Sequence, residues 1–200
     1  MAFRKDLLLI SSWIKPNTKV LDLGCGNGEL LKILKQDKNI SGYGIDNDIK
    51  NIKLSLRNNV NILQMDLDKG LNGFELESFD YVVLSQTLQA FLNPEVVINE
   101  LLRVGKKAIV TIPNFGYWKV RLHLLTKGTM PITKTLPDEW YNTPNLHMCT
   151  IKDFVYFVKS RNFKIFKSLA LNGHNVSLIN DTNLGIKNLF ADLGIFLIEK

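Results

Sequence analysis

The sequence predicts an α/β domain in which a mostly parallel sheet carries helices on both faces. Short apolar segments alternate with amphipathic ones along most of the 200 residues, a pattern typical of parallel strands joined by helices. A glycine-rich turn, Gly24 to Gly28, links the first apolar segment to a helical one. The next apolar segment ends in Asp46, near the offset of about 20 residues at which nucleotide-binding α/β folds place a carboxylate.

The first part of the chain alternates regularly between strand and helix patterns. The leading segment, residues 3–14, has one apolar face and is expected to lie as a helix across the sheet edge. Asp48 is expected to cap the helix that follows the second strand. The strands are expected at residues 19–23, 40–46 and 60–65, with helices between them at 29–38 and 48–57.

The middle of the chain predicts a central strand, a helix and a further strand. Residues 79–85 are apolar enough for a strand that is buried on both faces. Asn93 and Pro94 then predict a helix start, with asparagine as the cap and proline at the first helical position. Gly105 is expected to end this helix, and residues 107–112 are expected to form the fifth strand.

The regular pattern lapses over residues 114–149, which is too long for an ordinary connection. We expect a structured insertion that covers the pocket on its substrate side, within a single domain of residues 1–200. Thr150 and Asp153 then have the spacing of a capping box, for a helix to about residue 161. Two closing strands, at 163–171 and 193–199, give a sheet of seven strands.

Composition favours a soluble globular domain. The chain is 46% hydrophobic, yet it has no apolar run long enough to cross a membrane, and its first residues do not resemble a signal peptide. We therefore expect a cytoplasmic protein that does not associate with membranes. The net charge of +6 is spread along the chain without a basic strip, so a solvated lysine surface is a better interpretation than nucleic-acid binding.

Cysteines and histidines are too scattered to predict a metal site or a disulfide. Cys25 lies in the glycine turn, far in sequence from Cys149. His123, His147 and His174 show no metal-ligand spacing. We expect no metal.

The glycine turn favours a cationic ligand over a dinucleotide. A dinucleotide fingerprint needs a third glycine three positions after Gly26, where this chain has Glu29. Asp22 lies two residues before the first glycine, Gly24, and a carboxylate so close to the turn attracts a positive group. S-adenosylmethionine carries both an ammonium and a sulfonium, and it fits this pattern.

Further candidates lie where the predicted strands end, since ligands of open α/β sheets bind there. Asp46 can accept from both ribose hydroxyls, although a helix cap is the alternative. Asp66 can accept from the adenine amino group, or it can start a turn. Met65 either packs on the adenine ring or belongs to the hydrophobic core. The full set expected to contact the cofactor is Asp22, Gly24, Cys25, Gly26, Asp46, Asn47, Met65, Asp66, Leu67, Ser85 and Gln86.

Ser85 and Gln86 belong to a polar run that directly follows a buried strand. Polar side chains there need partners, so they either line the pocket or satisfy local backbone groups. We expect pocket lining.

The irregular region supplies the candidates for the acceptor side. His123 and His147 are candidate bases, which are needed only if the acceptor must lose a proton. The other residues either shape an acceptor pocket or form a small separate core under the long loop. They are Asn114, Tyr117, Trp118, Arg121, Trp140, Tyr141, Thr143 and Asn145.

Several motifs resemble those of a known family. Residues 21–28, LDLGCGNG, resemble the first motif of class I S-adenosylmethionine-dependent methyltransferases. More specific segments resemble the methionine biosynthesis protein MetW family, and the match covers nearly the whole chain. These segments are Asp6-Leu7, Trp13-Ile14, Asp22–Gly26, Ser85–Ala90, Ile112–Gly116, Met130–Lys134 and Tyr141–Asn145.

The resemblance implies a Rossmann-like class I methyltransferase fold that binds S-adenosylmethionine or S-adenosylhomocysteine. It implies a role in methionine biosynthesis alongside a homoserine O-acyltransferase, and the family has no established methyl acceptor. The resemblance assigns a cofactor-binding role most strongly to Asp22, Gly24, Gly26 and Asp46. It assigns this role less strongly to Asp66, Ser85 and Gln86. The family often has Asp and His where this chain has Asn27 and Tyr117, so one candidate base is missing.

Two functions follow as expectations. The first is methyl transfer to a small molecule. The second is a non-catalytic partner that binds the cofactor and regulates the acyltransferase, and the lack of a strong candidate base favours it. A nucleic-acid methyltransferase is disfavoured, because Pro113-Asn114-Phe115 matches the signature of amino-methylating enzymes only loosely.

Overall fold

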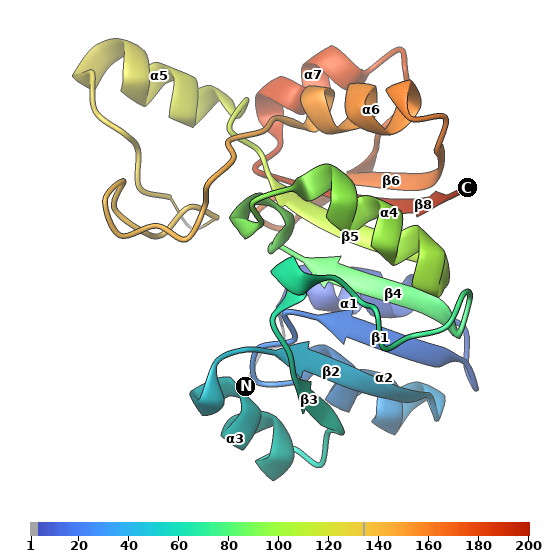
Figure 1. Ribbon diagram of the computed structural model, residues 1–200. Helices are drawn as coiled ribbons and strands as arrows, with labels where there is room; N and C mark the ends of the chain where they lie inside the picture. Colours follow the sequence, from blue (N-terminus) through green and yellow to red (C-terminus); the bar gives the residue numbers. More distant parts are fainter. Residues whose placement is uncertain (1–3, 134) are drawn as a thin grey trace.

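The computed structural model describes residues 4–133 and 135–200 (Figure 1). Phe3, expected at the start of the leading helix, and Lys134, at the end of one family motif, lie outside the described residues. The strands are β1 (Lys19–Leu23), β2 (Ser41–Asp46), β3 (Ile62–Gln64), β4 (Phe79–Ser85), β5 (Gly105–Pro113), β6 (Lys164–Asn172), β7 (Asn175–Leu178) and β8 (Leu193–Glu199). The helices are α1 (Lys5–Trp13), α2 (Glu29–Lys38), α3 (Ile49–Arg57), α4 (Pro94–Val104), α5 (Trp118–Lys127), α6 (Ile151–Ser160) and α7 (Leu184–Phe190), with short 3-10 helices η1 (Leu67–Lys69) and η2 (Leu88–Ala90).

All eight strands form one sheet in the order β3-β2-β1-β4-β5-β8-β6-β7. The first five strands run parallel, while β8 is antiparallel to both β5 and β6. The chain moves outward from β1 to β3 and then returns to β4 on the other side of β1. Strand order therefore reverses between β1 and β4, and in such sheets the crevice at this point, beyond the carboxyl ends of the strands, binds ligands.

Helices cover both faces of the sheet, as the sequence predicted (Figure 1). On one face, α4, α6 and α7 contribute to the larger core cluster, in which Ile98, Phe154 and Val158 are buried. On the other face, α1 and α2 pack together over a second cluster, with Ile10 and Leu34 fully buried. Each such side chain contributes about 1.5–3 kcal/mol by leaving water, so the two layers hold the strand ends in fixed positions.

The expectation of seven strands is wrong by one, because β7 was not predicted. Its four residues pair only with β6 at the sheet edge and are mostly exposed, so they carry no continuous apolar pattern. Helices α5 and α7 were also missed. The leading helix α1 lies on a face of the sheet beside α2 rather than across the edge, because its apolar side chains join the second core cluster.

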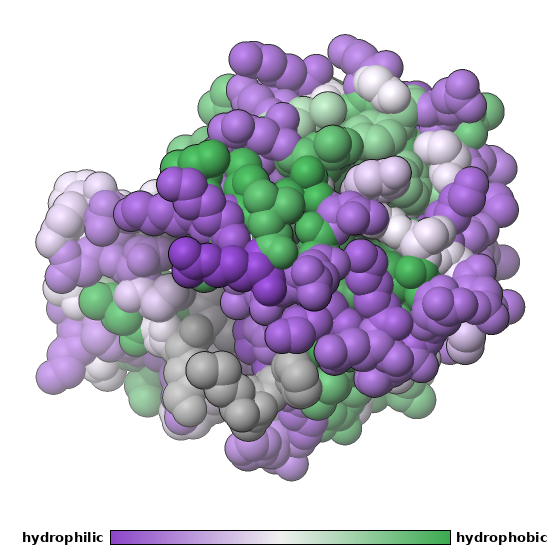
Figure 2. Space-filling view, turned by 90° about the horizontal axis from the view of Figure 1, so that it is seen from below, coloured by the Kyte–Doolittle hydropathy of each residue, from purple (hydrophilic) through white to green (hydrophobic). Residues whose placement is uncertain are grey.

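The other edge of the sheet is formed by β3, with α3 beside it. Figure 2 looks toward this end of the molecule, where hydrophobic and hydrophilic residues lie in adjacent patches. Exposed apolar side chains of these two elements are Ile49, Leu54, Leu56 and Leu63.

Residues 114–149, called the arm here, project from the body of the domain (Figure 1). The described residues of the arm form α5 and an irregular return segment, and among them a small apolar cluster of Phe115, Tyr117, Val120 and Leu136 packs together. Its return segment is attached to η2, because the backbone oxygen of Gln89 accepts from Leu146 N at 2.8 Å and from His147 N at 3.0 Å.

Candidate functional site

A pocket of about 360 Å³ opens at the carboxyl ends of the parallel strands. The predicted cofactor residues that line it are Gly24, Gly26, Asp46, Asn47, Met65, Asp66 and Leu67. The rest of its lining was not predicted to contact the cofactor, and it consists of Asp48, Asn51, Asp68, Thr87, Ala90, Phe91 and Pro144. Pro144 comes from the arm, so the arm contributes to the pocket wall.

The glycine loop after β1 forms the floor of this pocket. Gly24 and Gly26 have φ values of +65° and +56°, in the left-handed region that favours glycine. A Cβ on Gly24 would lie 2.9 Å from the Thr87 side chain, whereas a Cβ on Gly26 would meet no atom within 4 Å. The backbone at Gly26 therefore faces open space, which a ligand can approach closely.

Side chains from β2 and α3 fix the peptide groups of Gly26. The N–H of Gly26 donates to Asp46 Oδ2 at 2.9 Å, and its carbonyl oxygen accepts from Ser55 Oγ at 2.9 Å. Asp46 also accepts through Oδ1 from Asp48 N at 2.9 Å, and from the Asn51 amide. The Asn51 amide shares both carboxylate oxygens, at 3.2 Å from Oδ1 and 3.3 Å from Oδ2, and these are the longest of the contacts to Asp46. A carboxylate has about four lone-pair sites, so a ligand hydroxyl can bind Asp46 by replacing the Asn51 contacts. Asp48 caps α3, as predicted.

Asp22 lies at 3% exposure in β1, two residues before Gly24, and is not among the residues that line the pocket. No residue in the described part of the chain donates a hydrogen bond to its carboxylate. Burial raises the pKa of Asp22 to about 7, while the charge of Arg4 lowers it and that of Asp46 raises it further. A buried carboxylate without a partner favours a nearby positive group.

The two thiols are poor nucleophiles. Burial, and then the charges of Asp22 and Asp46, raise the pKa of Cys25 to about 12. A Cβ on Gly44 would lie 2.5 Å from the Cys25 sulfur, so this side chain packs against β2 rather than lining the pocket. Burial likewise raises the pKa of Cys149 to about 11. Both groups stay protonated at neutral pH.

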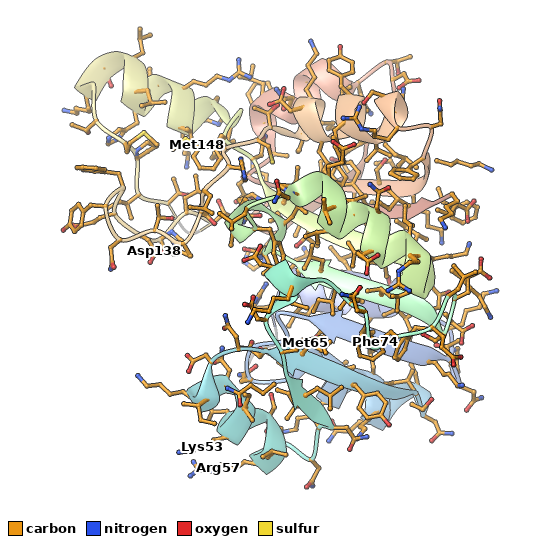
Figure 3. The ribbon with its side chains drawn as sticks, in the orientation of Figure 1. Lys53, Arg57, Met65, Phe74, Asp138 and Met148 are labelled. Carbon is orange, nitrogen blue, oxygen red and sulfur yellow. The ribbon has the colours of Figure 1, made fainter. Side chains whose placement is uncertain are left out.

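The segment after β3 has a structural role and also lines the pocket. Asp66 accepts from Asp68 N at 3.2 Å, which starts η1, and its Oδ2 lies 3.6 Å from Lys69 Nζ. Met65 and Leu67 pack partly against the larger core cluster. Figure 3 shows Met65 where the chain leaves β3. These residues therefore take part in the turn or the packing and also line the pocket, and their contacts with the adenine stay predictions.

Ser85 and Gln86 do not line the described pocket, while the next residue, Thr87, does. The hydroxyl of Ser85 lies 3.3 Å from Thr111 Oγ1, and the N–H of Gln86 donates to the same hydroxyl at 2.8 Å. These contacts satisfy local groups, the alternative the sequence left open. Gln86 adopts a left-handed φ of +54°.

Gln86 connects the end of β4 to the start of the chain. Its Nε2 donates to Asp6 Oδ2 at 2.9 Å. Asp6 also accepts from Arg4, at 3.2 Å from Nε and 2.6 Å from Nη2. Sequence reasoning missed Arg4 and Asp6, because no local pattern shows that the chain start meets the end of a distant strand.

Most of the predicted acceptor-side residues lie away from the pocket. Asn114 is buried, and its Nδ2 donates to Asn188 O and Ala191 O at 2.8 and 2.7 Å, so it holds the base of the arm. Tyr117 donates to Asn172 at 3.3 Å and packs in the arm's own cluster. Arg121 donates to Gly116 O at 2.6 Å. Trp118, Trp140, Tyr141, Thr143 and Asn145 are exposed or half-buried and do not line the pocket.

The candidate bases also lie outside the pocket lining. His123 lies on α5 with its Nε2 3.0 Å from Thr129 Oγ1. His147 Nε2 lies 3.3 Å from the Leu92 carbonyl oxygen. Each ring therefore has a local partner, and neither faces the pocket.

The pocket is acidic, although the chain carries a net charge of +6. Its lining includes the carboxylates of Asp46, Asp48, Asp66 and Asp68. Among the described residues that line it there is no lysine, arginine or histidine. This charge distribution favours a ligand with positive charge.

Several solved structures with the same fold are described as methyltransferases. A Thermotoga maritima protein described as an SAM-dependent methyltransferase, possible histamine N-methyltransferase, matches with a TM-score of 0.69 at 17% identity, over 97% of this chain and 87% of that one. An SAM-dependent methyltransferase from Methanosarcina mazei matches with a TM-score of 0.66 at 18% identity, over 100% and 99% of the two chains. The fold is therefore the Rossmann-like class I methyltransferase fold.

Sequence comparison identifies the family within this fold. The profile of the family Methionine biosynthesis protein MetW matches residues 4–198, and the chain belongs to that family. A curated relative from Rhodopirellula baltica, the "Bifunctional methionine biosynthesis protein MetXA/MetW", is 34% identical over 183 residues. That match covers 86% of this chain but only 29% of the relative, so the chain spans less than a third of that bifunctional protein.

No helix in residues 4–133 and 135–200 has both the length and the apolar character needed to cross a membrane.

Proposed function

We propose that the chain binds S-adenosylmethionine in the pocket above the glycine loop and transfers its methyl group to a small molecule. The observation that carries this proposal is the combination of Gly26, with open space above it, and Asp46, which lines the same pocket. A ligand here meets bare backbone and a ribose-binding carboxylate together.

The residues present fit this cofactor. Asp46 would accept from the ribose hydroxyls, Asp66 would accept from the adenine amino group, and Met65 and Leu67 would pack on the ring. The buried carboxylate of Asp22 lacks a hydrogen-bond donor among the described residues, and it would attract the ammonium group. The carboxylates around the pocket would favour the positive sulfonium as well.

The bound cofactor supplies an activated methyl group, and the protein's part is to position the two reactants. In the described structure the pocket has no histidine, and both thiols stay protonated at neutral pH. This set of residues suits an acceptor that is nucleophilic without losing a proton to the protein, such as a thioether or a free amine.

Calorimetric titration with S-adenosylmethionine and S-adenosylhomocysteine tests the binding step. We expect each ligand to bind with 1:1 stoichiometry. If neither ligand binds, the proposal is wrong. Methyl transfer is tested separately, by incubating the protein with methyl-labelled cofactor and a small-molecule extract of the host. Label recovered in a small molecule supports methyl transfer. Absence of label from every fraction contradicts it.

The second candidate function is a cofactor-binding partner that regulates a homoserine O-acyltransferase. The bifunctional relative favours it, because its name joins MetW to a MetXA part in one chain. The arm also favours it, because its projecting surface exposes large apolar side chains, among them Leu125 at 83%, Trp140 at 72% and Tyr141 at 69%. Large exposed apolar side chains that gather on one projecting segment favour a protein–protein contact.

An assay of the host's acyltransferase, with and without this protein, distinguishes the two functions. A regulatory partner changes acyltransferase turnover, and its cofactor affinity changes when the acyltransferase is present, because coupling between sites is reciprocal. Unchanged turnover together with unchanged cofactor affinity would contradict the regulatory function and leave the methyltransferase.

A further inference from the structure

We propose that Arg4 binds the carboxylate at the amino-acid end of the cofactor, held in place by Asp6 and Gln86. This inference rests on the proposed cofactor site and extends it to the part of the ligand that the pocket does not enclose. Arg4 lies outside the pocket lining, before the first helix.

The hydrogen bonds among Arg4, Asp6 and Gln86 place Arg4 on the side of the pocket where the amino-acid end of the cofactor is expected. Gln86 directly precedes Thr87, which lines the pocket and would contact a Cβ on Gly24. Through Asp6, Gln86 holds the Arg4 side chain near the end of β4, and Arg4 is close enough to Asp22 of β1 to interact with its charge. A ribose at Asp46 and an adenine at Asp66 would lie over β2 and β3, so the amino-acid end would extend the opposite way, toward β1 and β4.

The guanidinium retains a free edge in this arrangement. Asp6 accepts from Nε and Nη2, which occupies one side of the planar group. Within the described residues, nothing accepts from Nη1. The edge formed by Nη1 and Nη2 can therefore make a bidentate contact with a second carboxylate, which is the geometry that arginine provides and lysine does not.

The two nearby charges match the two charges of a zwitterionic ligand. Asp22 is buried and has no donor among the described residues, while the Arg4 side chain is 51% exposed. Arg4 is also close enough to Asp22 for its charge to act on that carboxylate. An α-amino acid group carries an ammonium and a carboxylate on the same carbon atom, so one group can meet both residues.

Asp6 is a positioning residue in this scheme. It is 6% exposed, and both of its oxygens are used, by Arg4 and by Gln86. Because the aspartate is held from two directions, the guanidinium keeps its orientation before the ligand arrives, which reduces the entropy lost on binding.

Ligands with and without the amino-acid groups provide the test, and each ligand's affinity for a variant is compared with its own affinity for the wild type. S-adenosylhomocysteine has the ammonium and the carboxylate, decarboxylated S-adenosylmethionine keeps the ammonium alone, and 5′-methylthioadenosine has neither. The affinity of each is measured by calorimetry for the wild type, Arg4→Gln, Arg4→Lys and the control Arg57→Gln. Arg57 is an exposed arginine that points away from the body at the end of α3 (Figure 3).

We expect Arg4→Gln to raise the Kd of S-adenosylhomocysteine by about 10- to 100-fold, the usual effect of losing a charge-assisted bidentate contact. The affinities of 5′-methylthioadenosine and decarboxylated S-adenosylmethionine should change by less than about twofold, since neither ligand has the carboxylate. Arg4→Lys should give a smaller loss for S-adenosylhomocysteine, and Arg57→Gln should change none of the three.

Equal weakening of S-adenosylhomocysteine and 5′-methylthioadenosine would overturn the proposal. Equal weakening of S-adenosylhomocysteine and decarboxylated S-adenosylmethionine would overturn it too, because Arg4 would then act through Asp22. If Arg4→Gln does not fold, Arg4→Lys is judged by the same comparison. A wild-type protein that binds none of these ligands would refute the proposed function itself, whereas a failure confined to the variants would leave that function standing.

Discussion

Asp46 Oδ2 accepts a hydrogen bond from the N–H of Gly26 at 2.9 Å, which joins the end of β2 to the glycine loop after β1. The same carboxylate lines the pocket. One side chain therefore shapes the loop and is also available to a ligand, and experiments on the site have to separate these two roles.

Replacing Asp46 with alanine should weaken S-adenosylhomocysteine binding by about 1–3 kcal/mol, because ligand hydroxyls lose their acceptor. The control is Ser55→Ala, which removes the hydrogen bond to the carbonyl oxygen of Gly26 without removing any pocket-lining group. Calorimetry compares the two variants. An equal loss in both would assign the effect to a loosened loop rather than to a direct contact.

Gly26→Val should abolish cofactor binding while the domain stays folded. The valine side chain would enter the open space above the loop, at a φ that costs a non-glycine residue about 1–2 kcal/mol. Gly128→Val is a matched control, since Gly128 has a φ of +66°, no atom within 4 Å of a Cβ, and a position at the end of α5.

Both glycine variants should lower Tm by a similar amount, and only Gly26→Val should lose the ligand. Retained binding by Gly26→Val would show that the loop does not hold the cofactor.

Asp22 should make stability depend on pH. Burial raises its pKa to about 7 in the folded state, from an ordinary value of 3.8. Between these values the folded protein holds a proton that the unfolded chain has released, so the stability from this group is full below about pH 4 and is lost as pH rises toward 7.

Asp22→Asn cannot ionise, so its Tm relative to wild type should increase from about pH 5 to about pH 8 in the absence of ligand. A difference in Tm that stays constant over this range would contradict the raised pKa. Cofactor binding should also release protons near pH 6, because the ammonium favours the ionised carboxylate, and titration in buffers of different ionisation enthalpy measures this release.

Asn114→Ala should destabilise the fold without affecting the cofactor. Its amide donates to two carbonyl oxygens, and its Oδ1 accepts from Gly116 N and Ile151 N, all at buried positions. Leaving such groups unpaired should lower the free energy of unfolding by about 2–4 kcal/mol, as measured in urea. Asn145→Ala, at a less buried position of the arm, should have little effect. Loss of cofactor affinity in a folded Asn114→Ala variant would restore its predicted place in the site.

Leu125→Glu tests whether the arm binds the acyltransferase. This side chain is 83% exposed, so the charge should leave stability unchanged, but in a buried interface it should weaken association by at least about 2 kcal/mol. Leu76→Glu is the control, an exposed leucine between η1 and β4, away from the arm. Sedimentation with the acyltransferase measures both variants, and equal affinities would place the contact elsewhere.

Sequence reasoning worked best where local pattern and buried environment agree. The strand β4 was predicted with its observed bounds because most of its residues are apolar, and the α6 capping box was visible in Thr150 and Asp153. Gly24, Gly26 and Asp46 were found because loop geometry and strand ends impose residue types.

Residues fixed by long-range contacts were not predictable in this way. The role of Asn114 depends on backbone atoms of Asn188 and Ala191, far along the chain. The Arg4–Asp6–Gln86 network likewise joins the chain start to the end of β4. The exposed strand β7 carries no apolar alternation, so only its pairing with β6 reveals it.

Backbone atoms hold the arm to η2, from Leu146 N and His147 N to the carbonyl oxygen of Gln89, and the His147 ring adds one contact to the Leu92 carbonyl oxygen. Backbone donors are present whatever side chain a residue carries, proline excepted. The side chains of the arm can therefore diverge during evolution while the return segment keeps the same anchor beside Ala90 and Phe91, which line the pocket. A chain built in this way can acquire a new partner surface on the exposed part of the arm while Pro144, which lines the pocket, keeps its place.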